Sequence, residues 1–327
     1  MSNQTARIIR KAINKKEKYN ILTFDTHERY QTQLAKTGHN FYSFRYQGCK
    51  TWNETFSKLP DNYYILPENV LYKSIDFDFI LSQSKFGQFQ VAKKIQQDFK
   101  LPIVSLEHTL PIDSWPEAQL KSFRSMSGDI NVFISKYSKD IWDIDQDADI
   151  IHHSVDTDLF KPNHNIQKST TVLSVVNDFK NRDYCCNYSG WKRITKGLPV
   201  KLVGDSPGLS KPAESVEELA REYQSTQVFL NTSTISPVPT ALLEAMACGC
   251  AVVSTATCMI PEIIVNGVNG FISNDEEELT EYIKMILDSS YLRERLGIEA
   301  RKTILEKFSE DEFVSSWNKV FDRAYGV

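Results

Sequence analysis

Short apolar runs alternate with segments of helical periodicity along the whole chain of 327 residues. This alternation is typical of parallel strands joined by helices, because each crossover must bring the chain back to the same edge of a sheet. It predicts an α/β fold in which helices cover both faces of parallel sheets. The predicted strands are Tyr19–Phe24, Phe41–Arg45, Asn62–Leu66, Phe77–Ser82, Pro102–Leu106, Ile130–Ser135, Asp149–His152, Thr171–Val176, Val200–Val203, Val228–Asn231 and Ala251–Thr255. The predicted helices are His27–Lys36, Phe86–Phe99, Glu117–Met126, Lys136–Trp142, Val216–Gln224, Thr240–Ala247, Glu276–Asp288, Ser290–Phe308 and Glu310–Ala324.

The length favours two domains of about 150 residues each. A polar turn, Pro162-Asn-His-Asn-Ile-Gln-Lys, lies near the middle of the chain. We therefore expect two Rossmann-like domains, residues 1–155 and 156–308. Ligands of open parallel sheets bind beyond the carboxyl ends of the strands, so the two sheets should face a central cleft that holds the ligand.

No apolar run approaches the ~20 residues that a membrane helix needs. The first residues also lack the apolar stretch of a secretory signal, which favours a cytoplasmic protein without a transmembrane segment. Six of the first twenty side chains are basic: Arg7, Arg10, Lys11, Lys15, Lys16 and Lys18. Residues 7–18 are therefore either a solvated start of the chain or a peripheral contact with an anionic membrane or a phosphate backbone.

The most informative stretch is Phe229–Thr255, which reads FLNTSTISPVPTALLEAMACGCAVVST. A strand ends at Asn231, a loop of small hydroxyl residues follows, and Pro237 and Pro239 fix the backbone where a helix begins. The first N–H groups of a helix have no partner within it, and the helix end carries a partial positive charge. These features predict an anion site suited to a diphosphate, with donors from Thr240, Ala241 and Leu242.

Glu244 lies just over one turn into this otherwise apolar helix. A carboxylate there is costly unless hydrogen-bond donors satisfy it. The two hydroxyls of a ribose would do so; the alternative is an acid favoured only by the helix dipole. Gly249 should end the helix in the left-handed conformation.

Several motifs resemble those of family 4 retaining glycosyltransferases of the GT-B fold. They are residues 241–255, Ile260-Pro-Glu-Ile-Ile, Asn266-Gly-Val-Asn-Gly-Phe and His153-Ser-Val-Asp-Thr-Asp-Leu-Phe-Lys-Pro. The resemblance covers residues 129–162 and 226–326 and is only architectural elsewhere. It implies a C-terminal helix, residues 309–327, that crosses back to the first domain. It also implies that the first domain binds the acceptor and the second the nucleotide sugar.

The resemblance further implies roles for individual residues. Glu244 matches the second glutamate of the family's E-x7-E pair, which grips the donor ribose. The first glutamate, beside the transferred sugar, is replaced by Ser236, and the family's Gly-Gly before Pro-Glu is replaced by Cys258-Met259. Arg182 is the best candidate for the diphosphate clamp, because a guanidinium suits bidentate phosphate contact. The expected donor-binding residues are Lys180, Lys192, Ser236, Val238, Thr240, Ala241 and Glu244, and the expected catalytic residues are His108, Arg182 and Ser236.

In the first domain, Thr26-His27 replaces the glycine pair that the family has after its first strand. His27 and Arg29 are therefore candidates for contact with the acceptor or a phosphate; the alternative for His27 is a capping or surface residue. His108 follows a strand at its carboxyl end, where a ligand is expected. The Asp-x-Asp pairs 76/78, 143/145, 145/147 and 147/149 could suggest a metal, but we expect none, because a helix N-terminus is available for the diphosphate.

The sequence thus predicts a metal-independent retaining glycosyltransferase that uses a nucleoside-diphosphate sugar as co-substrate and no cofactor. The acceptor would be the hydroxyl of a glycan or of a lipid-linked molecule. One alternative is a phage-type DNA glycosyltransferase that modifies a hydroxymethylated base, for which the basic start of the chain is the support. Another is a non-catalytic sugar-nucleotide-binding protein, suggested by the replacement at Ser236.

Overall fold

The computed structural model describes residues 16–54, 56–112, 114–144 and 147–327. The chain forms two compact units. Unit 1 comprises Met1–His152 and Asp311–Val327, and unit 2 comprises His153–Glu310. Each unit is built on one sheet, and the strand pairs in both sheets are parallel. The predicted α/β fold with parallel sheets is confirmed.

Unit 1 has a seven-stranded sheet in the order β3-β2-β1-β4-β5-β6-β7. The strands are β1 Asn20–Thr23, β2 Asn40–Ser43, β3 Tyr63–Ile65, β4 Phe79–Ser82, β5 Ile103–Glu107, β6 Ile130–Phe133 and β7 Ala148–Ile150. Its helices are α2 Glu28–Ala35, α3 Gln88–Phe99, α4 Glu117–Arg124, α5 Lys136–Trp142 and α13 Glu310–Gly326. The chain adds strands on one side of β1 and later continues on the other side through β4, so the order reverses between β1 and β4.

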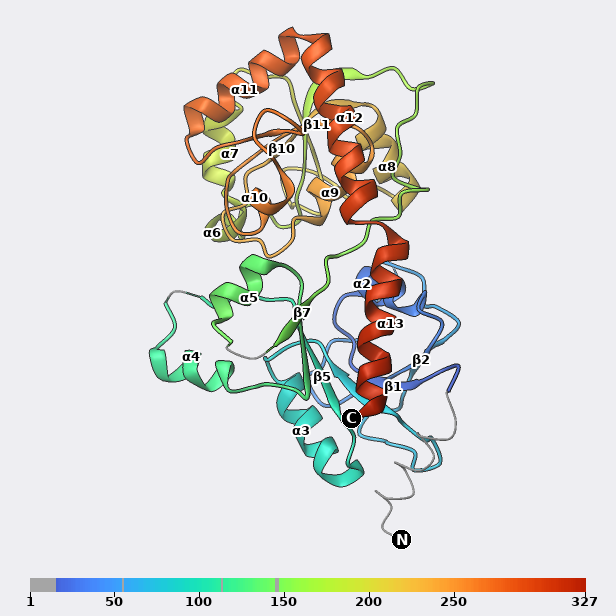
Figure 1. Ribbon diagram of the computed structural model, residues 1–327. Coiled ribbons are helices and arrows are strands. Elements are labelled where there is room, and N and C mark those ends of the chain that lie inside the picture. Colours follow the sequence, from blue (N-terminus) through green and yellow to red (C-terminus); the bar gives the residue numbers. More distant parts are fainter. Residues whose placement is uncertain (1–15, 55, 113, 145–146) are drawn as a thin grey trace. The chain divides into compact units, whose positions relative to one another are not determined.

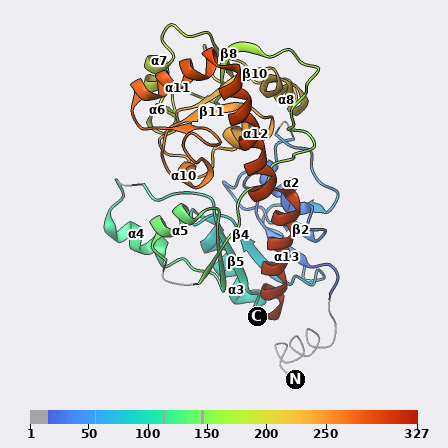
Figure 2. The same ribbon diagram turned by 45° about the horizontal axis from the view of Figure 1, so that its top comes forward.

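Both faces of this sheet are covered, as alternating side chains require. On one face Leu22 and Ile80 pack with Phe89 of α3. On the other face Phe79 meets Phe321 of α13, with ring centroids 5.4 Å apart. Helix α13 therefore completes the core of unit 1, although it is the last helix of the chain (Figure 2).

Unit 2 has a five-stranded sheet in the order β12-β11-β10-β8-β9. Its strands are β8 Ser169–Val175, β9 Val200–Val203, β10 Thr226–Asn231, β11 Ala251–Ser254 and β12 Phe271–Ile272. Its helices are α6 Asp183–Cys186, α7 Tyr188–Ile194, α8 Val216–Gln224, α9 Thr240–Ala247, α10 Ile260–Ile263, α11 Glu276–Asp288 and α12 Ser290–Lys307 (Figure 1). Here the order reverses between β8 and β10.

Alternation along β10 again separates two layers of helices. Val228 and Leu230 join the core formed with Ile283 of α11. Phe229 points to the opposite face and meets Tyr223 of α8, with ring centroids 5.8 Å apart. Unit 2 is thus also a sheet between two helical layers.

Four elements of unit 2 were missed by the sequence prediction: α6, α7, α10 and β12. Each of these elements is short. Helix α7 also contains Gly190, and glycine has a low helix propensity. The structure explains the glycine, because the Asn187 side chain caps α7 by accepting the Gly190 N–H at 3.0 Å. A Cβ at this position would lie 2.3 Å from the Asn187 amide nitrogen.

The sequence-based boundaries, 155/156 and 308/309, compare with divisions after His152 and after Glu310 in the structure. Within the described residues, no helix combines the length and the apolar character needed to cross a membrane.

Candidate functional site

In unit 2, the point where the strand order reverses lies between β8 and β10. Open α/β sheets bind ligands beyond the carboxyl ends of the strands at such a point. The loop after β8 carries Lys180 and Arg182, and the loop after β10 carries Ser236 and Val238 before it enters α9. The topology therefore brings the ends of two segments that hold predicted donor-binding residues to the same edge of one sheet.

The start of α9 differs from the prediction in its backbone hydrogen bonds. The N–H of Thr240 donates to the carbonyl of Val238 at 3.0 Å, and the N–H of Leu242 donates to the carbonyl of Pro239 at 2.9 Å. Pro239 has φ −80° and ψ 84°, close to an inverse γ-turn, which closes the first of these bonds. The expectation of three open donors is wrong for Thr240 and Leu242. Among the described residues, the N–H of Ala241 is the one of the three that has no hydrogen-bond partner.

The end of α9 is as predicted. Gly249 has φ +72°, its N–H donates to the carbonyl of Met246, and the N–H of Cys250 donates to the carbonyl of Ala245, both at 3.0 Å. This is the Schellman arrangement, in which two backbone bonds satisfy the last carbonyls of a helix. The helix is therefore fixed at its buried end.

Glu244 lies on the buried side of α9, with 7% of its surface exposed. Its Oε2 accepts a hydrogen bond at 3.0 Å from the hydroxyl of Tyr223, which is itself fully buried on α8. A neutral phenol donor thus reduces the cost of burying the carboxylate. Glu244 also lies three residues after Ala241, so the two share one face of the helix.

The loop after β10 is held rigidly by its neighbours. The Thr232 hydroxyl donates to the carbonyl of Cys186 at 2.9 Å, and the Thr234 N–H donates to the carbonyl of Cys185 at 2.9 Å. On the other side, Thr255 and Thr257 donate their hydroxyls to the carbonyl of Ser233, at 2.5 and 2.8 Å. This bracing positions the half-buried side chains of Ser236 and Val238 that follow.

The predicted cations lie on two neighbouring elements. Arg182 is the N-cap of α6, is exposed, and donates from its guanidinium to the carbonyl of Asn177 at 3.4 Å. Because α6 also accepts the bonds from Thr232 and Thr234, Arg182 belongs to the same braced assembly as the loop after β10. Lys180 is exposed in the loop before α6. Lys192 lies on α7 with its ammonium 4.8 Å from the centroid of the Tyr188 ring, a cation–π contact.

In unit 1 the structure brings two predicted histidines together. His27 follows β1 and His108 follows β5, and their ring centroids lie 5.2 Å apart at an interplanar angle of 78°. His27 is the N-cap residue of α2, but its side chain makes no capping bond and is exposed. His108 is buried, and its ring also meets that of Tyr30 at 4.5 Å. Arg29 is exposed on α2 beside them in sequence.

Sequence reasoning missed Gln83, which directly follows β4 and is fully buried. Its amide contacts His108, Thr23 and the backbone of Phe24. Nothing in the local sequence marks this glutamine. Its position becomes informative only with the strand order, which places the end of β4 between the ends of β1 and β5.

Two further buried residues near His108, Lys85 and Glu107, are joined by a backbone-to-side-chain hydrogen bond. The N–H of Lys85 donates to the Glu107 carboxylate at 3.0 Å, and the Lys85 ammonium donates to the carbonyl of Met126. Burial lowers the pKa of Lys85, and burial raises the pKa of Glu107 against the hydrogen bonds from Thr109. This pair fixes the segment between Glu107 and Thr109 and therefore the backbone that carries His108.

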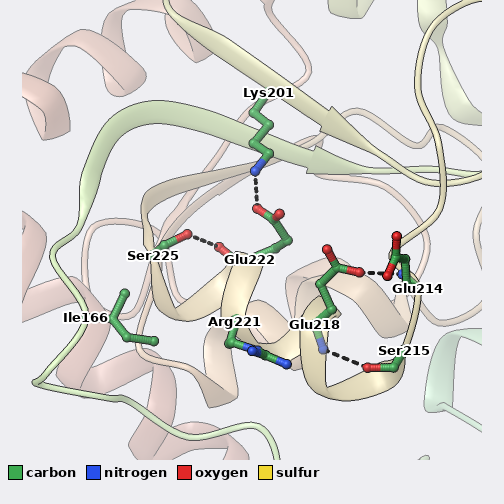
Figure 3. A pocket seen from close by; sticks show the side chains of 8 residues that line it. All are labelled: Ile166, Lys201, Glu214, Ser215, Glu218, Arg221, Glu222 and Ser225. Atoms are coloured by element: carbon green, nitrogen blue, oxygen red, sulfur yellow. Dashed lines mark hydrogen bonds and ion pairs between the residues drawn. The ribbon is translucent and has the colours of Figure 1, made fainter.

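A groove of ≈ 710 Å³ lies along α8, and Figure 3 shows the side chains that line it. The lining residues are Ile166, Lys201, Glu214, Ser215, Glu218, Arg221, Glu222 and Ser225. Two of them, Lys201 and Glu222, form an ion pair. None of the predicted site residues lines this groove, so it is separate from the candidate donor site.

Arg7, Arg10, Lys11 and Lys15 of the predicted basic segment lie outside the described residues. Lys16, which is described, pairs with Asp78 at 2.6 Å. Among the residues that the structure describes, no three His, Cys, Asp or Glu side chains are grouped so that they could hold a metal ion.

Comparisons with known proteins show what the chain is similar to. Residues 211–303 match the family model described as glycosyl transferases group 1. An uncharacterized glycosyltransferase of Methanocaldococcus jannaschii is 22% identical over 307 residues, which cover 77% of this chain and 76% of that protein. The N-acetyl-alpha-D-glucosaminyl L-malate synthase of Bacillus anthracis is 23% identical over 191 residues, and the match spans half of that protein's length (52% of this chain, 50% of that protein).

Among solved structures, HepE of Anabaena in complex with UDP superposes with a TM-score of 0.74, at 14% identity, over 94% of this chain and 100% of that one. The chain therefore has the GT-B fold, and its residues 211–303 are similar to the glycosyl transferases of group 1.

Proposed function

We propose that the chain is a retaining glycosyltransferase that moves a sugar from a nucleoside-diphosphate sugar to a hydroxyl of a glycan or of a lipid-linked acceptor. In this proposal unit 2 binds the donor and unit 1 binds the acceptor. The observation that carries the proposal is the Glu244 carboxylate, buried on the first turns of α9 on the same face as the open N–H of Ala241. The group 1 match over residues 211–303, which includes all of α9, supports the same assignment.

The donor would be held by groups of different chemistry. The Ala241 N–H and the positive end of α9 suit one phosphate, and the exposed guanidinium of Arg182 suits another. Glu244 would accept hydrogen bonds from the ribose hydroxyls. Ser236, with its short neutral side chain, and Val238 would lie beside the transferred sugar, and Lys180 and Lys192 would add positive charge near the diphosphate.

The reaction needs no metal in this proposal. The bond between the anomeric carbon and the diphosphate oxygen breaks, and a bond to the acceptor oxygen forms on the same face of the sugar. The proton of the acceptor hydroxyl passes to the leaving diphosphate. Arg182 and the helix end would stabilise the negative charge that develops on that diphosphate.

Binding to UDP, GDP and ADP by calorimetry tests the donor site, with UDP first because HepE was solved with it. Loss of the hydrogen bonds to a charged carboxylate costs ~1.5–3 kcal/mol, so Glu244→Ala should weaken binding roughly 10- to 100-fold. Glu222→Ala, a matched removal of a carboxylate from the groove along α8, should bind like the wild type. Equal affinity of Glu244→Ala and wild type would refute the ribose assignment.

A second experiment separates transfer from binding alone. The wild type should release the nucleoside diphosphate from the matching sugar donor, and the product should keep the anomeric configuration of the donor. Tight donor binding without any release of the diphosphate would favour a non-catalytic sugar-nucleotide-binding protein instead.

A further inference from the structure

Three loops of unit 1 meet around the imidazole of His108. They follow β1, β4 and β5, whose carboxyl ends lie side by side at the point where the strand order reverses. The link between them is the buried side chain of Gln83, which follows β4 and contacts the other two segments. Because an amide has one donating and one accepting end, its orientation determines what it can offer to His108.

Two bonds fix the orientation of the Gln83 amide. The hydroxyl of Thr23 donates its proton to the carbonyl of Leu81 at 3.2 Å, so its oxygen can only accept from Gln83, at 3.0 Å. The carbonyl of Phe24, 3.4 Å away, is also purely an acceptor. The end of the amide that faces Thr23 and Phe24 is therefore the nitrogen, and the end that faces His108 is the oxygen.

The Nε2 atom of His108 lies 3.4 Å from this oxygen. Since an amide oxygen only accepts, Nε2 must carry a proton. We infer that Gln83 is a positioning residue that holds His108 in the Nε2–H tautomer, the form that carries its lone pair on Nδ1. The link to catalysis rests on the proposed glycosyl transfer, but the tautomer does not.

The surrounding residues hold the ring and the amide in place. The rings of Tyr30 and His108 meet nearly at right angles, at 86°. Tyr30 is itself fixed by the indole N–H of Trp317 on α13, which donates to its hydroxyl at 3.1 Å. On the other side, the side chain of Gln88 accepts the N–H of Gln83 at 3.1 Å. The tautomer is therefore set within a rigid environment.

Nitrogen-15 NMR of protein labelled at histidine tests the inference directly, because the two tautomers differ in which ring nitrogen carries the proton. His108→Asn identifies the signal of His108 among the six histidines of the chain. The wild type should show His108 protonated at Nε2 and not at Nδ1. A wild-type His108 protonated at Nδ1 overturns the inference, whatever the variants do.

Two variants and a matched control test the role of Gln83. Gln83→Leu should let both tautomers form, whereas Gln83→Glu should keep Nε2–H, because a carboxylate also accepts. Gln31→Leu is the control: Gln31 is a buried glutamine that also donates to the carbonyl of Phe24, at 2.7 Å, and it should leave the His108 tautomer unchanged. A Gln83→Leu spectrum with His108 still entirely Nε2–H also contradicts the role of Gln83.

Kinetics connects the tautomer to the proposed reaction. Gln83→Leu should lower kcat about tenfold, Gln83→Glu should recover most of that loss, and the affinity for UDP in unit 2 should not change. If the NMR result holds and no sugar transfer is found, the proposed function fails while the tautomer stands. If transfer is found and His108 is Nδ1–H, this inference fails alone.

Discussion

At the scale of single residues, one glycine of unit 2 allows two loops to approach each other closely. Gly204 follows β9 with φ +129°, and a Cβ there would lie 2.3 Å from the carbonyl oxygen of Val176 in the loop after β8. Asn177 in that loop also accepts the N–H of Asp205 at 2.8 Å. The loop that leads to Arg182 therefore depends on close backbone approach at Gly204.

This contact gives a residue-scale prediction. Gly204→Ala should cost about 3 kcal/mol of unfolding free energy, because the new Cβ meets backbone that cannot move aside. Gly208→Ala is the matched control, since Gly208 also has a positive φ, +74°, but has open space around it. It should cost only ~1 kcal/mol, the conformational penalty alone. Denaturant unfolding compares the two, and equal costs would show that the contact with Val176 is unimportant.

A second prediction concerns Glu28, a buried carboxylate at the start of α2. It accepts the Lys50 ammonium at 2.7 Å and the N–H of Asn53 at 3.1 Å. Burial raises the pKa of Glu28, but these partners outweigh it, so the pKa lies below 4.5. The folded state then holds this proton more weakly than the unfolded state does. The contribution of the ionised Glu28 to the free energy of unfolding is present above pH 4.5 and is lost as the pH falls through the folded-state pKa.

Glu28→Gln should therefore cost ~2 kcal/mol at neutral pH. Its difference from the wild type should shrink in acid, as the wild-type carboxyl becomes protonated. Urea unfolding at neutral and acidic pH measures this, and Glu68→Gln, an exposed glutamate, serves as the control. A difference that stays constant with pH would contradict the assigned hydrogen bonds.

At the scale of elements, hydrophobic periodicity was sufficient for the long helices and the buried strands. It located α8 and α11 with the bounds found in the structure, because their apolar faces are regular and Ser215 and Asp275 cap their first turns. The bounds of α9 were also correct, because prolines precede the helix and Gly249 ends it. Periodicity did not predict α6 and α7, because both helices are short and they contain adjacent cysteines and a glycine, which give no clear helical pattern. Arg182 is the N-cap of α6 and Lys192 lies on α7, so the surroundings of these two cations could not be predicted from the sequence.

The prediction of open N–H groups at the start of α9 was wrong for a different reason. The pattern Pro-Val-Pro-Thr locates the helix end, but which N–H groups remain open depends on the backbone angles at Pro239. Those angles follow from how the loop after β10 is bonded to α6 and to the loop after β11. Glu244, in contrast, was found from the sequence because a lone acid in an apolar helix is conspicuous.

Helix α13 gives an element-scale prediction. Trp317 is fully buried, and its indole N–H reaches Tyr30, so Trp317→Ala should destabilise unit 1 by ~3–5 kcal/mol. Hydrogen exchange should show faster opening of β1 and β4, with the strands of unit 2 unchanged. The control Tyr291→Ala, at a side chain that is 77% exposed on α12, should change neither unit. Slower or unchanged exchange in β1 would mean that α13 is not part of the core of unit 1.

For the whole molecule, the strand orders explain why few site residues could be assigned from the sequence. In each sheet the order in which strands are added reverses once. The loops that meet at this point come from strands far apart in sequence. His27 and His108 meet in unit 1 through β1 and β5, and Gln83 joins them from β4. Such meetings depend on strand order, which alternating apolar runs do not specify.

The central claim is that the donor nucleotide binds unit 2 where β8 and β10 end. Hydrogen exchange of the full chain, with and without saturating UDP, tests it most directly, because a ligand slows exchange where it orders backbone. We predict slower exchange over residues 177–186 and 232–244, and no change in the residues that line the groove along α8. Protection confined to that groove or to unit 1, with residues 232–244 unaffected, would contradict the claim.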